Sequence, residues 1–368
     1  MTTPNLDILV PAYVREFEPY VPSKPDPELK KLYGCRRLYR LNNNENPLGP
    51  PPGAQEVIRH FLPPKGAVYP SGESYYLRRE IAALHGIDPD QIVVGNGANE
   101  VIAFVIKAFC EKGDNIITAD KTFAVYEWVA TFSGIGARTI PLKDEGFDDR
   151  EMLRARDGNT KILFVCNPNN PTGTIVTRKA LDEFLSKLPD RVILVLDEAY
   201  CDFVDSPNFP DGVGYVKKGK QVIVLRTFSK VYGLAGLRIG YALGREDLIK
   251  GLNQVRDPFP VHRLAQVAAE AALKDKEYEE MSVQMVRDGR KYLCRELERL
   301  GLSYVPSQAN FILIDFGRDI NRVFEDLLRE GIIIRPGRMW NYPTSGRVTI
   351  GRIGDHRRLI KALRKILR

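Results

Sequence analysis

The chain has 368 residues, of which 43% are hydrophobic and 27% charged, and its formal net charge is +7. These proportions are ordinary for a folded globular protein and argue against an intrinsically disordered chain. The positive charge favours anionic ligands, but no module combines basic and aromatic residues in the manner of nucleic-acid-binding proteins.

Cysteine and histidine usage indicates the compartment and argues against a metal centre. The five cysteines are scattered without paired spacing, which is typical of a reducing compartment, and the four histidines do not cluster. The start of the chain lacks the basic and apolar segments of a signal peptide, and no apolar run approaches membrane-spanning length. We therefore expect a cytoplasmic protein with no bound metal, no membrane contact and no nucleic-acid partner.

Three regions of the chain differ in pattern. Residues 1–45 are punctuated by prolines and predict an extended arm that joins a small domain. Over residues 46–265 short apolar runs alternate with helical patterns, which is typical of a mostly parallel sheet covered on both faces. Residues 266–368 predict a smaller α+β domain, closed by an amphipathic helix with Leu359 and Leu363 on its apolar stripe. The runs expected as strands of the large sheet are "IVVG", "NIITA", "KILFVCN", "VILVLDEA", "VIVLRTFS" and "RIGYAL".

Polar side chains stand at four predicted strand ends, where open α/β sheets place their ligand residues. The first, "GNGANE", begins like a dinucleotide-binding turn, but Glu100 occupies the place of the third glycine. This difference argues against a nicotinamide cofactor. The backbone N–H groups of Gly97, Ala98 and Asn99 at the start of a helix still predict a seat for a phosphate group.

The second strand end, "LDEAY", places Asp197 directly after an apolar run. A carboxylate in such a dry place requires a cation or hydrogen-bond donors, so a structural ion pair or a helix cap is the plain alternative to a ligand role. Tyr200 follows three residues later and can face the same ligand. The third strand end, "CNPNNPTG", is by itself only a tight turn.

The fourth strand end, "TFSK", is the most unusual, because a charged lysine is unfavourable at the end of a buried strand unless a ligand uses its amine. A Schiff base between Lys230 and an aldehyde cofactor would be such a use. Thr227, Ser229 and Arg238 would then hold the phosphate group of that cofactor by charge-assisted hydrogen bonds. Asp197 would keep a pyridine nitrogen protonated.

With these motifs the chain resembles the fold-type I pyridoxal-phosphate aminotransferases of class I and II, and among them the branch that acts on histidinol phosphate. The likeness runs from "EFEPYVPSKP" near the start to "GIIIRPG" and "GRVTIGR" near the end. It implies an α/β fold with a large αβα domain and a mostly parallel sheet, a smaller α+β domain, and pyridoxal 5′-phosphate as cofactor. It also implies a homodimer with shared active sites.

The resemblance implies a role for each residue that matches a family motif. Lys230, Asp197 and Tyr200 would be catalytic: Lys230 joins the cofactor, Asp197 contacts its ring nitrogen, and Tyr200 contacts its phenolic oxygen. Asn170 would contact the same oxygen, and Tyr126 would stack on the ring. The residues expected at the cofactor phosphate are Ala98, Asn99, Thr227, Ser229 and Arg238, together with Tyr69 of the partner subunit. The residues expected at the substrate are Arg347, for an anionic group, and Arg335 and Tyr20, for the substrate phosphate.

The implied reaction transfers an amino group between histidinol phosphate and 2-oxoglutarate, giving imidazole acetol phosphate and glutamate, in histidine biosynthesis. The sequence departs from the family pattern at Asn99, at Lys121 and in "RDPFPVHRLAQ", and these departures bear on the identity of the substrate. An aromatic or broad-range aminotransferase and a threonine-phosphate decarboxylase share the same motifs. A non-catalytic regulator that binds the cofactor is the alternative from another class, but the chain has no room for the DNA-binding domain that such proteins usually add.

Overall fold

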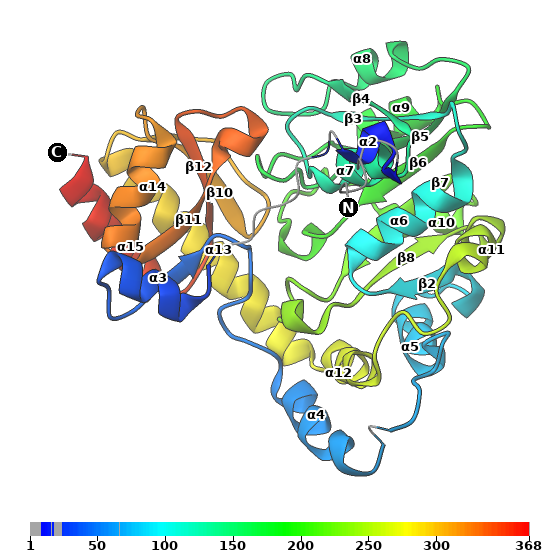
Figure 1. The fold of residues 1–368 in the computed structure, drawn as a ribbon, viewed down its shortest axis with the longest axis horizontal. Coiled ribbons are helices and arrows are strands. Elements are labelled where there is room, and N and C mark those ends of the chain that lie inside the picture. The colour runs from blue at the N-terminus through cyan, green and yellow to red at the C-terminus, as the bar shows by residue number, and fades with distance from the viewer. Residues whose placement is uncertain (1–8, 16, 18–23, 66, 368) are drawn as a thin grey trace, which may run out of the picture.

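A computed structural model describes the chain except for residues 1–8, 16, 18–23, 66 and 368, and describes only the backbone of residues 62–65. Two sheets, each covered by helices, form a larger and a smaller unit (Figure 1). The long helix α13 (Lys276–Arg299) runs between them.

The larger unit is built on a seven-stranded sheet with the strand order β2-β8-β7-β6-β5-β3-β4. Strand β8 is antiparallel to both of its neighbours, and the other pairs of strands are parallel. The predicted α/β fold with a mostly parallel sheet is therefore confirmed. The strands are β2 (Ile92–Gly95), β3 (Asn115–Ala119), β4 (Gly136–Ile140), β5 (Thr160–Cys166), β6 (Ile193–Asp197), β7 (Val222–Thr227) and β8 (Gly240–Gly244).

Helices cover both faces of this sheet because successive strand residues point to opposite sides. In β6, Ile193 and Val195 face the core formed with α6, α7 and α11, whereas Leu194 and Leu196 face the core formed with α5, α9 and α10. Burial on both faces explains why these strands are continuous apolar runs. The helices of this unit are α4 (Pro52–Lys65), α5 (Tyr75–His85), α6 (Ala98–Phe109), α7 (Val125–Phe132), α8 (Asp149–Arg154), α9 (Arg178–Leu185), α10 (Gly212–Lys217), α11 (Glu246–Val255) and α12 (Arg263–Lys274).

Strand β4 was not predicted. It is the edge strand beside β3, and all five of its residues are exposed or half-buried. An edge strand needs no continuous apolar run, so "GARTI" gives no strand signal of the kind that marks its neighbours.

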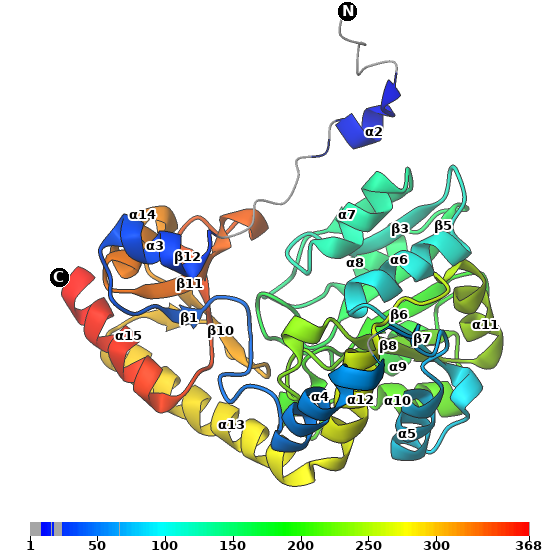
Figure 2. The ribbon, with the colours of Figure 1, turned by 60° about the horizontal axis from the view of Figure 1, so that its bottom comes forward.

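The smaller unit has a five-stranded sheet with the order β1-β11-β12-β10-β9. Its first strand comes from the N-terminal arm, since Tyr39 pairs with Ile332 of β11. Figure 2 shows α3 and α14 on one face of this sheet and α13 and α15 on the other. Leu359 and Leu363 of the closing helix α15 are fully buried, as its apolar stripe predicted. The elements are α3 (Asp26–Tyr33), β1 (Tyr39–Leu41), β9 (Ser303–Tyr304), β10 (Phe311–Asp315), α14 (Ile320–Arg329), β11 (Ile332–Pro336), β12 (Ser345–Thr349) and α15 (Ile353–Ile366).

The predicted domain boundary at residue 265 falls inside α12. This helix packs against α4 and α5 of the larger unit (Figure 2), so the larger unit continues through α12 and the turn at Asp275. The remaining elements are short: α2 (Ala12–Arg15), which contacts α7, and the 3-10 turns η1 (Pro89–Gln91), η2 (Cys201–Phe203), η3 (Ala235–Leu237) and η4 (Gly337–Trp340). Among the described residues, no helix combines the length and the apolar character needed to cross a membrane.

Candidate active site

The carboxyl ends of β5, β6 and β7 meet at a cavity of about 270 Å³. Neighbouring parallel strands bring their ends to one edge of the sheet, which is why motifs far apart in the sequence come together here. The predicted residues that line this cavity are Ala98, Asn99, Asn170, Asp197, Tyr200, Thr227, Ser229, Lys230 and Arg238.

Lys230 projects its amine into this cavity from the loop that follows β7. Its Nζ donates a hydrogen bond to the carbonyl oxygen of Asn43 at 3.2 Å, and it lies 5.5 Å from the centre of the Tyr200 ring. Burial, and then the positive charge of Arg347, lower the pKa of Lys230 from 10.5 to about 7, although Glu45 opposes the shift. At neutral pH the amine is therefore partly neutral, which is the form that acts as a nucleophile or a base.

Asp197 ends β6 and is buried, with only 3% of its surface exposed. Its Oδ2 accepts a hydrogen bond from the Tyr126 hydroxyl at 2.5 Å, and its Oδ1 accepts one from the Ala199 backbone N–H at 3.1 Å. The structural ion pair of this region belongs instead to the next residue, since Glu198 pairs with Arg226 at 2.7 Å. Asp197 itself lines the cavity, where its carboxylate can meet a ligand.

Tyr126 does not lie where the resemblance placed it. Its ring is fully buried, does not line the cavity, and stacks on Phe164 with ring centres 4.6 Å apart and planes 13° apart. Phe123, three residues earlier, presents an aromatic ring to the cavity instead. Both residues belong to one aromatic stretch at the start of α7, and spacing in the sequence does not decide which of them faces the cavity.

A seat for an anion lies where α6 begins. Gly97 caps this helix with φ of 81°, and a Cβ atom there would collide with the guanidinium group of Arg238. Glycine therefore allows Arg238 to approach the helix N-terminus, whose N–H groups and dipole favour a phosphate. Arg238 also lies 3.5 Å from the Ser229 hydroxyl, and the Ser229 N–H donates to Thr227 Oγ1 at 3.0 Å.

Glu100 shows why the glycine turn lacks the third glycine of a nucleotide-binding fingerprint. Its carboxylate accepts a hydrogen bond from the backbone N–H of Asn96 at 2.6 Å. The Glu100 side chain thus forms a hydrogen bond within the turn, which a glycine at this position could not form.

A second cavity of about 250 Å³ adjoins the first and shares Asn99, Phe123 and Asn170 with it. Arg335 and Arg347 both line it, and they stand directly opposite one another on the antiparallel strands β11 and β12. The smaller unit thus contributes two guanidinium groups beside the lysine of the larger unit. Trp128, Met339 and Trp340 give this second cavity an apolar wall.

Hydrogen bonds hold both arginines in place. Arg347 is 94% buried (6% exposed) and donates to the carbonyl oxygen of Asn42 at 2.6 Å and to Asn170 Oδ1. Arg335 donates to Asn43 Oδ1 at 2.8 Å. Tyr20, the third residue expected at the substrate, lies outside the described residues.

The asparagine run before Glu45 was quoted for the resemblance, but no role was predicted for its members. Asn43 contacts both Lys230 and Arg335, and Asn44 donates from Nδ2 to the Tyr200 hydroxyl at 3.0 Å. Burial raises the pKa of Tyr200 to about 12, so its hydroxyl keeps its proton at neutral pH. The signal available in the sequence was the unusual density of amide side chains at the end of the predicted extended arm.

Tyr69 does not line the cavity of its own chain. Its side chain is 76% exposed and stacks on Phe259, with ring centres 4.7 Å apart and planes 17° apart. The backbone of its loop is nevertheless fixed, because Gln266 Nε2 donates to Ser71 O at 3.0 Å and Arg256 donates to Gly72 O. An exposed ring on a fixed loop is suited to contact another molecule.

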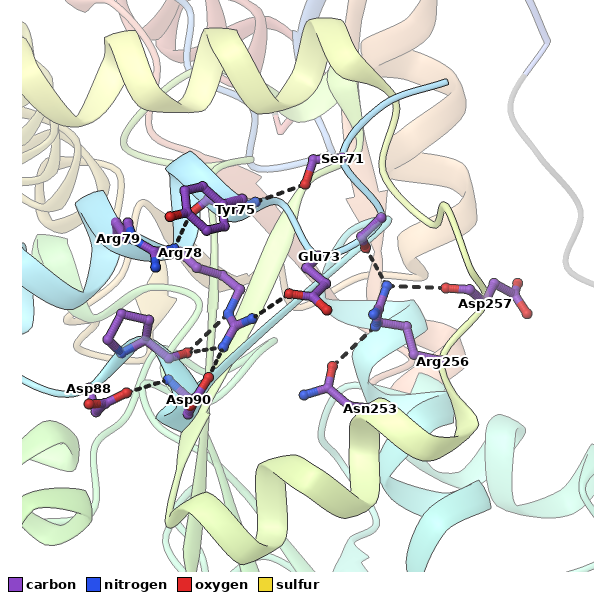
Figure 3. Close-up of polar contacts among 12 residues, drawn as sticks. Ser71, Glu73, Tyr75, Arg78, Arg79, Asp88, Asp90, Asn253, Arg256 and Asp257 are labelled. Carbon is purple, nitrogen blue, oxygen red and sulfur yellow. Dashed lines mark hydrogen bonds and ion pairs between the residues drawn. The ribbon is translucent and has the colours of Figure 1, made fainter. Parts of the chain in front are cut away.

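Figure 3 shows how this loop enters α5. Arg256 reaches the loop from the segment after α11 and is itself held by Asn253 Oδ1 at 3.1 Å. Arg78 joins the first turn of α5 to η1, since it donates to the carbonyl oxygen of Pro89 at 3.0 Å and to Asp90 at 2.8 Å. Arg256 thus holds the loop itself, and Arg78 holds the helix into which the loop continues.

The side chains of the first cavity fit pyridoxal phosphate. An amine, a buried carboxylate and a phenol stand in one chamber, as Lys230, Asp197 and Tyr200. The anion seat at the start of α6 exists because Gly97 leaves the space that a Cβ atom would fill. These are the groups that the aldehyde, the ring nitrogen, the phenolic oxygen and the phosphate of this cofactor each require.

Comparison with known proteins agrees with a site for pyridoxal phosphate. The model of the family "Aminotransferase class I and II" matches residues 36–366. A histidinol-phosphate aminotransferase of Moorella thermoacetica is 44% identical over 355 residues, which are 96% of this chain and 92% of that protein. A second such enzyme, from Carboxydothermus hydrogenoformans, is 41% identical over 96% of this chain and 98% of its own length.

Among solved structures, the histidinol-phosphate aminotransferase from Sinorhizobium meliloti in complex with pyridoxal-5′-phosphate superposes with a TM-score of 0.85. The two chains are 27% identical, and the match covers 97% of this chain and 96% of the other.

Proposed function

The chain belongs to the aminotransferase class I and II family and is a pyridoxal-phosphate-dependent transaminase, and from this premise we propose that it acts on histidinol phosphate and 2-oxoglutarate. One observation carries the choice of substrate. Arg335 and Arg347 stand opposite each other in a cavity that adjoins the cavity of Lys230. Two guanidinium groups suit substrates with a phosphate or carboxylate group beside the amine that reacts. The similarity to curated histidinol-phosphate aminotransferases over 96% of the chain supports the same substrate and a step of histidine biosynthesis.

Each residue of the site has a separate role in the proposed reaction. When bound, pyridoxal phosphate supplies an electron sink next to the α-carbon of the amino substrate. Lys230 Nζ, with its lowered pKa, is the base that takes the proton from that carbon and later returns a proton. The Asp197 carboxylate holds a proton at the ring nitrogen, and Tyr200 and Asn170 orient the phenolic oxygen.

The remaining site residues bind and orient. We propose that Phe123, rather than Tyr126, covers the face of the cofactor ring, because only Phe123 of the two lines the cavity. The phosphate group would be held by Ala98, Asn99, Thr227, Ser229 and Arg238 in the seat at the start of α6. Arg347 would hold a carboxylate, and Arg335 and Tyr20 would hold the phosphate of the amino substrate.

We also propose a homodimer with shared sites, in which Tyr69 of the partner subunit completes each phosphate seat. The exposure of the Tyr69 ring on an anchored loop supports this arrangement. The five cysteines are all free in the structure, which fits a reducing compartment, and we propose the cytoplasm.

A panel of substrates tests the proposed reaction. Purified enzyme is given histidinol phosphate, phenylalanine, tyrosine or threonine phosphate, each with and without 2-oxoglutarate. Histidinol phosphate with 2-oxoglutarate is expected to give the highest kcat/KM. A preference for phenylalanine or tyrosine would favour an aromatic aminotransferase, and release of carbon dioxide from threonine phosphate would favour a decarboxylase.

The Arg335→Ala variant tests how the substrate phosphate is bound. It is expected to lower kcat/KM for histidinol phosphate by roughly 10- to 100-fold, because a charge-assisted hydrogen bond is lost, and to affect phosphate-free amino acids far less. Arg338→Ala is the matched control, since Arg338 pairs with Asp319 at the surface and lines neither cavity. Equal losses for phosphate-bearing and phosphate-free substrates would exclude this role of Arg335.

A further inference from the structure

Tyr126 is a buried tyrosine to which the reaction described above assigns no part. It is the second residue of α7, its side chain is fully buried, and the flat face of its ring lies on Phe164 of β5. The edge of the ring meets Phe123, with ring centres 5.5 Å apart and planes 81° apart. These contacts leave the ring a single orientation, in which the hydroxyl points at Asp197.

The hydroxyl contacts the carboxylate that faces the cofactor. Tyr126 donates to Asp197 Oδ2 at 2.5 Å, while the Ala199 N–H donates to Oδ1 at 3.1 Å. Each oxygen of the carboxylate thus accepts one hydrogen bond from the protein, and the two bonds hold the carboxylate in position at the cavity wall. A charge-assisted hydrogen bond of this kind is short and stronger than a neutral one.

We propose that Tyr126 is a positioning residue that holds the Asp197 carboxylate ionised and aimed at the ring nitrogen of the cofactor. The proposal rests on the proposed function, since it gives Asp197 its task. It replaces the stacking role that the resemblance implied for Tyr126 with a role that acts through Asp197.

The surroundings of Asp197 explain why such a donor is needed. Burial raises the pKa of this carboxyl group, and the hydrogen bonds from Tyr126 and Ala199, followed by the charge of Lys230, oppose that rise. Cys166 at the end of β5 and Tyr200 after β6 also face it, but neither carries a positive charge. Among these side chains, Tyr126 is a donor to Asp197 that is fully buried and does not line the cavity, so the cofactor does not displace it.

The variant Tyr126→Phe removes the hydroxyl and keeps the ring on Phe164. The measurement is the affinity of the cofactor-free enzyme for added pyridoxal phosphate, followed by absorbance between about pH 5.5 and 8.5. Loss of a donor to the carboxylate raises the pKa of Asp197, so the acid side of the binding curve is expected to move to higher pH. Binding should be roughly tenfold weaker at the acid end and approach the wild-type value at the alkaline end.

Tyr215→Phe is the matched control. Tyr215 is also buried and also donates to an aspartate, Asp182 Oδ1, at 2.8 Å, but it lies on α10 and lines no part of the cavity. Both variants are expected to lower the melting temperature slightly, and only Tyr126→Phe should change cofactor binding. A second variant, Phe164→Leu, loosens the contact between the two rings but keeps the Tyr126 hydroxyl. It should also move the acid side of the cofactor-binding curve to higher pH, by a smaller amount than Tyr126→Phe does.

The double variant separates action through Asp197 from a direct effect. In an Asp197→Asn background, Tyr126→Phe is expected to change cofactor affinity by less than about twofold, because the charged partner is already gone. An unchanged binding curve for Tyr126→Phe, or the same tenfold loss in the Asp197→Asn background, would overturn the proposal. These readouts need no amino substrate, so they remain decisive if histidinol phosphate fails in the substrate panel.

Discussion

Lys230 lies among groups that push its pKa in opposite directions. Burial, Arg347 and Arg238 lower it, whereas Glu45 and Asp197 raise it, and the result is a pKa of about 7. The lysine must be neutral to attack an aldehyde, and an ordinary lysine is almost entirely charged at neutral pH. Under the proposed function, Arg347 would bind an anionic substrate and Arg238 the cofactor phosphate, and the same two charges lower the pKa of the amine.

This balance predicts how fast the cofactor-free enzyme captures pyridoxal phosphate at different pH values. The rate is expected to rise with pH, to reach half its maximum near pH 7, where about half of the amines are neutral, and to level off above that. Arg347→Met removes a neighbouring positive charge, raises the pKa of Lys230 and should move the midpoint to higher pH. Stopped-flow absorbance measures the rate of capture for the wild type and for the variant. A wild-type midpoint above pH 9 would contradict the lowered pKa of Lys230.

Residue types and their order in the chain were enough to predict the groups that carry charge in the cavity. Lys230 and Asp197 are costly at the ends of buried strands unless a ligand uses them, and Arg238 follows in the same motif as Lys230, so their presence was informative. Tyr126 and Phe123 were not distinguishable in this way, because either ring suits a cavity wall. Which of them faces the cavity depends on how α7 is rotated against β5, and that rotation is set by packing.

The loop that carries Tyr69 is an element held by its neighbours. Gln266 and Arg263 of α12 bind the backbone carbonyls of Ser71 and Tyr69, at 3.0 and 2.5 Å. Gly72 passes so close to Pro258 that a Cβ atom there would collide with the carbonyl oxygen. The segment "RDPFPVHRLAQ", which departs from the family pattern, supplies most of these contacts.

Gly72→Ala is expected to displace this loop. The collision is with backbone rather than with a flexible side chain, so we expect a loss of about 1–3 kcal/mol in the free energy of unfolding, together with weaker cofactor binding. Gly53→Ala in α4 is the matched control, because nothing lies within 4 Å of a Cβ atom there and alanine favours a helix. Thermal unfolding and cofactor titration compare the two. A Gly72→Ala protein as stable as the Gly53→Ala protein would show that the close contact does not constrain the loop.

The arrangement of the whole molecule explains why the two adjoining cavities draw on distant parts of the chain. Lys230 and Asp197 come from the larger sheet, Arg335 and Arg347 come from the smaller one, and Asn43 follows the arm strand that pairs with β11. Apolar runs predicted the larger sheet because its strands are buried on both faces. The boundary predicted at residue 265 falls inside α12, because α12 and α13 are consecutive helices in the sequence, and α12 packs on α4 of the larger unit.

The proposed dimer gives a last prediction, which concerns two chains at once. Tyr69 is exposed and does not line its own cavity, so if it serves a phosphate seat, we expect that seat to belong to a partner subunit. A two-fold interface repeats every contact, and each dimer would then contain two shared sites. Inactive Lys230→Ala chains are mixed with Tyr69→Ala chains of impaired activity and allowed to exchange subunits.

In a mixed dimer, the site that keeps Lys230 receives an intact Tyr69 from the Lys230→Ala chain. Random exchange of equal amounts makes about half of the dimers mixed. Activity per intact Lys230 should therefore rise above that of the Tyr69→Ala homodimer. Co-purification of wild-type chains with affinity-tagged Lys230→Ala chains in a parallel mixture measures how far exchange has gone. If exchange is complete and activity does not rise, Tyr69 contributes nothing to the site of a partner subunit, because every other requirement of that site is met in the mixed dimer.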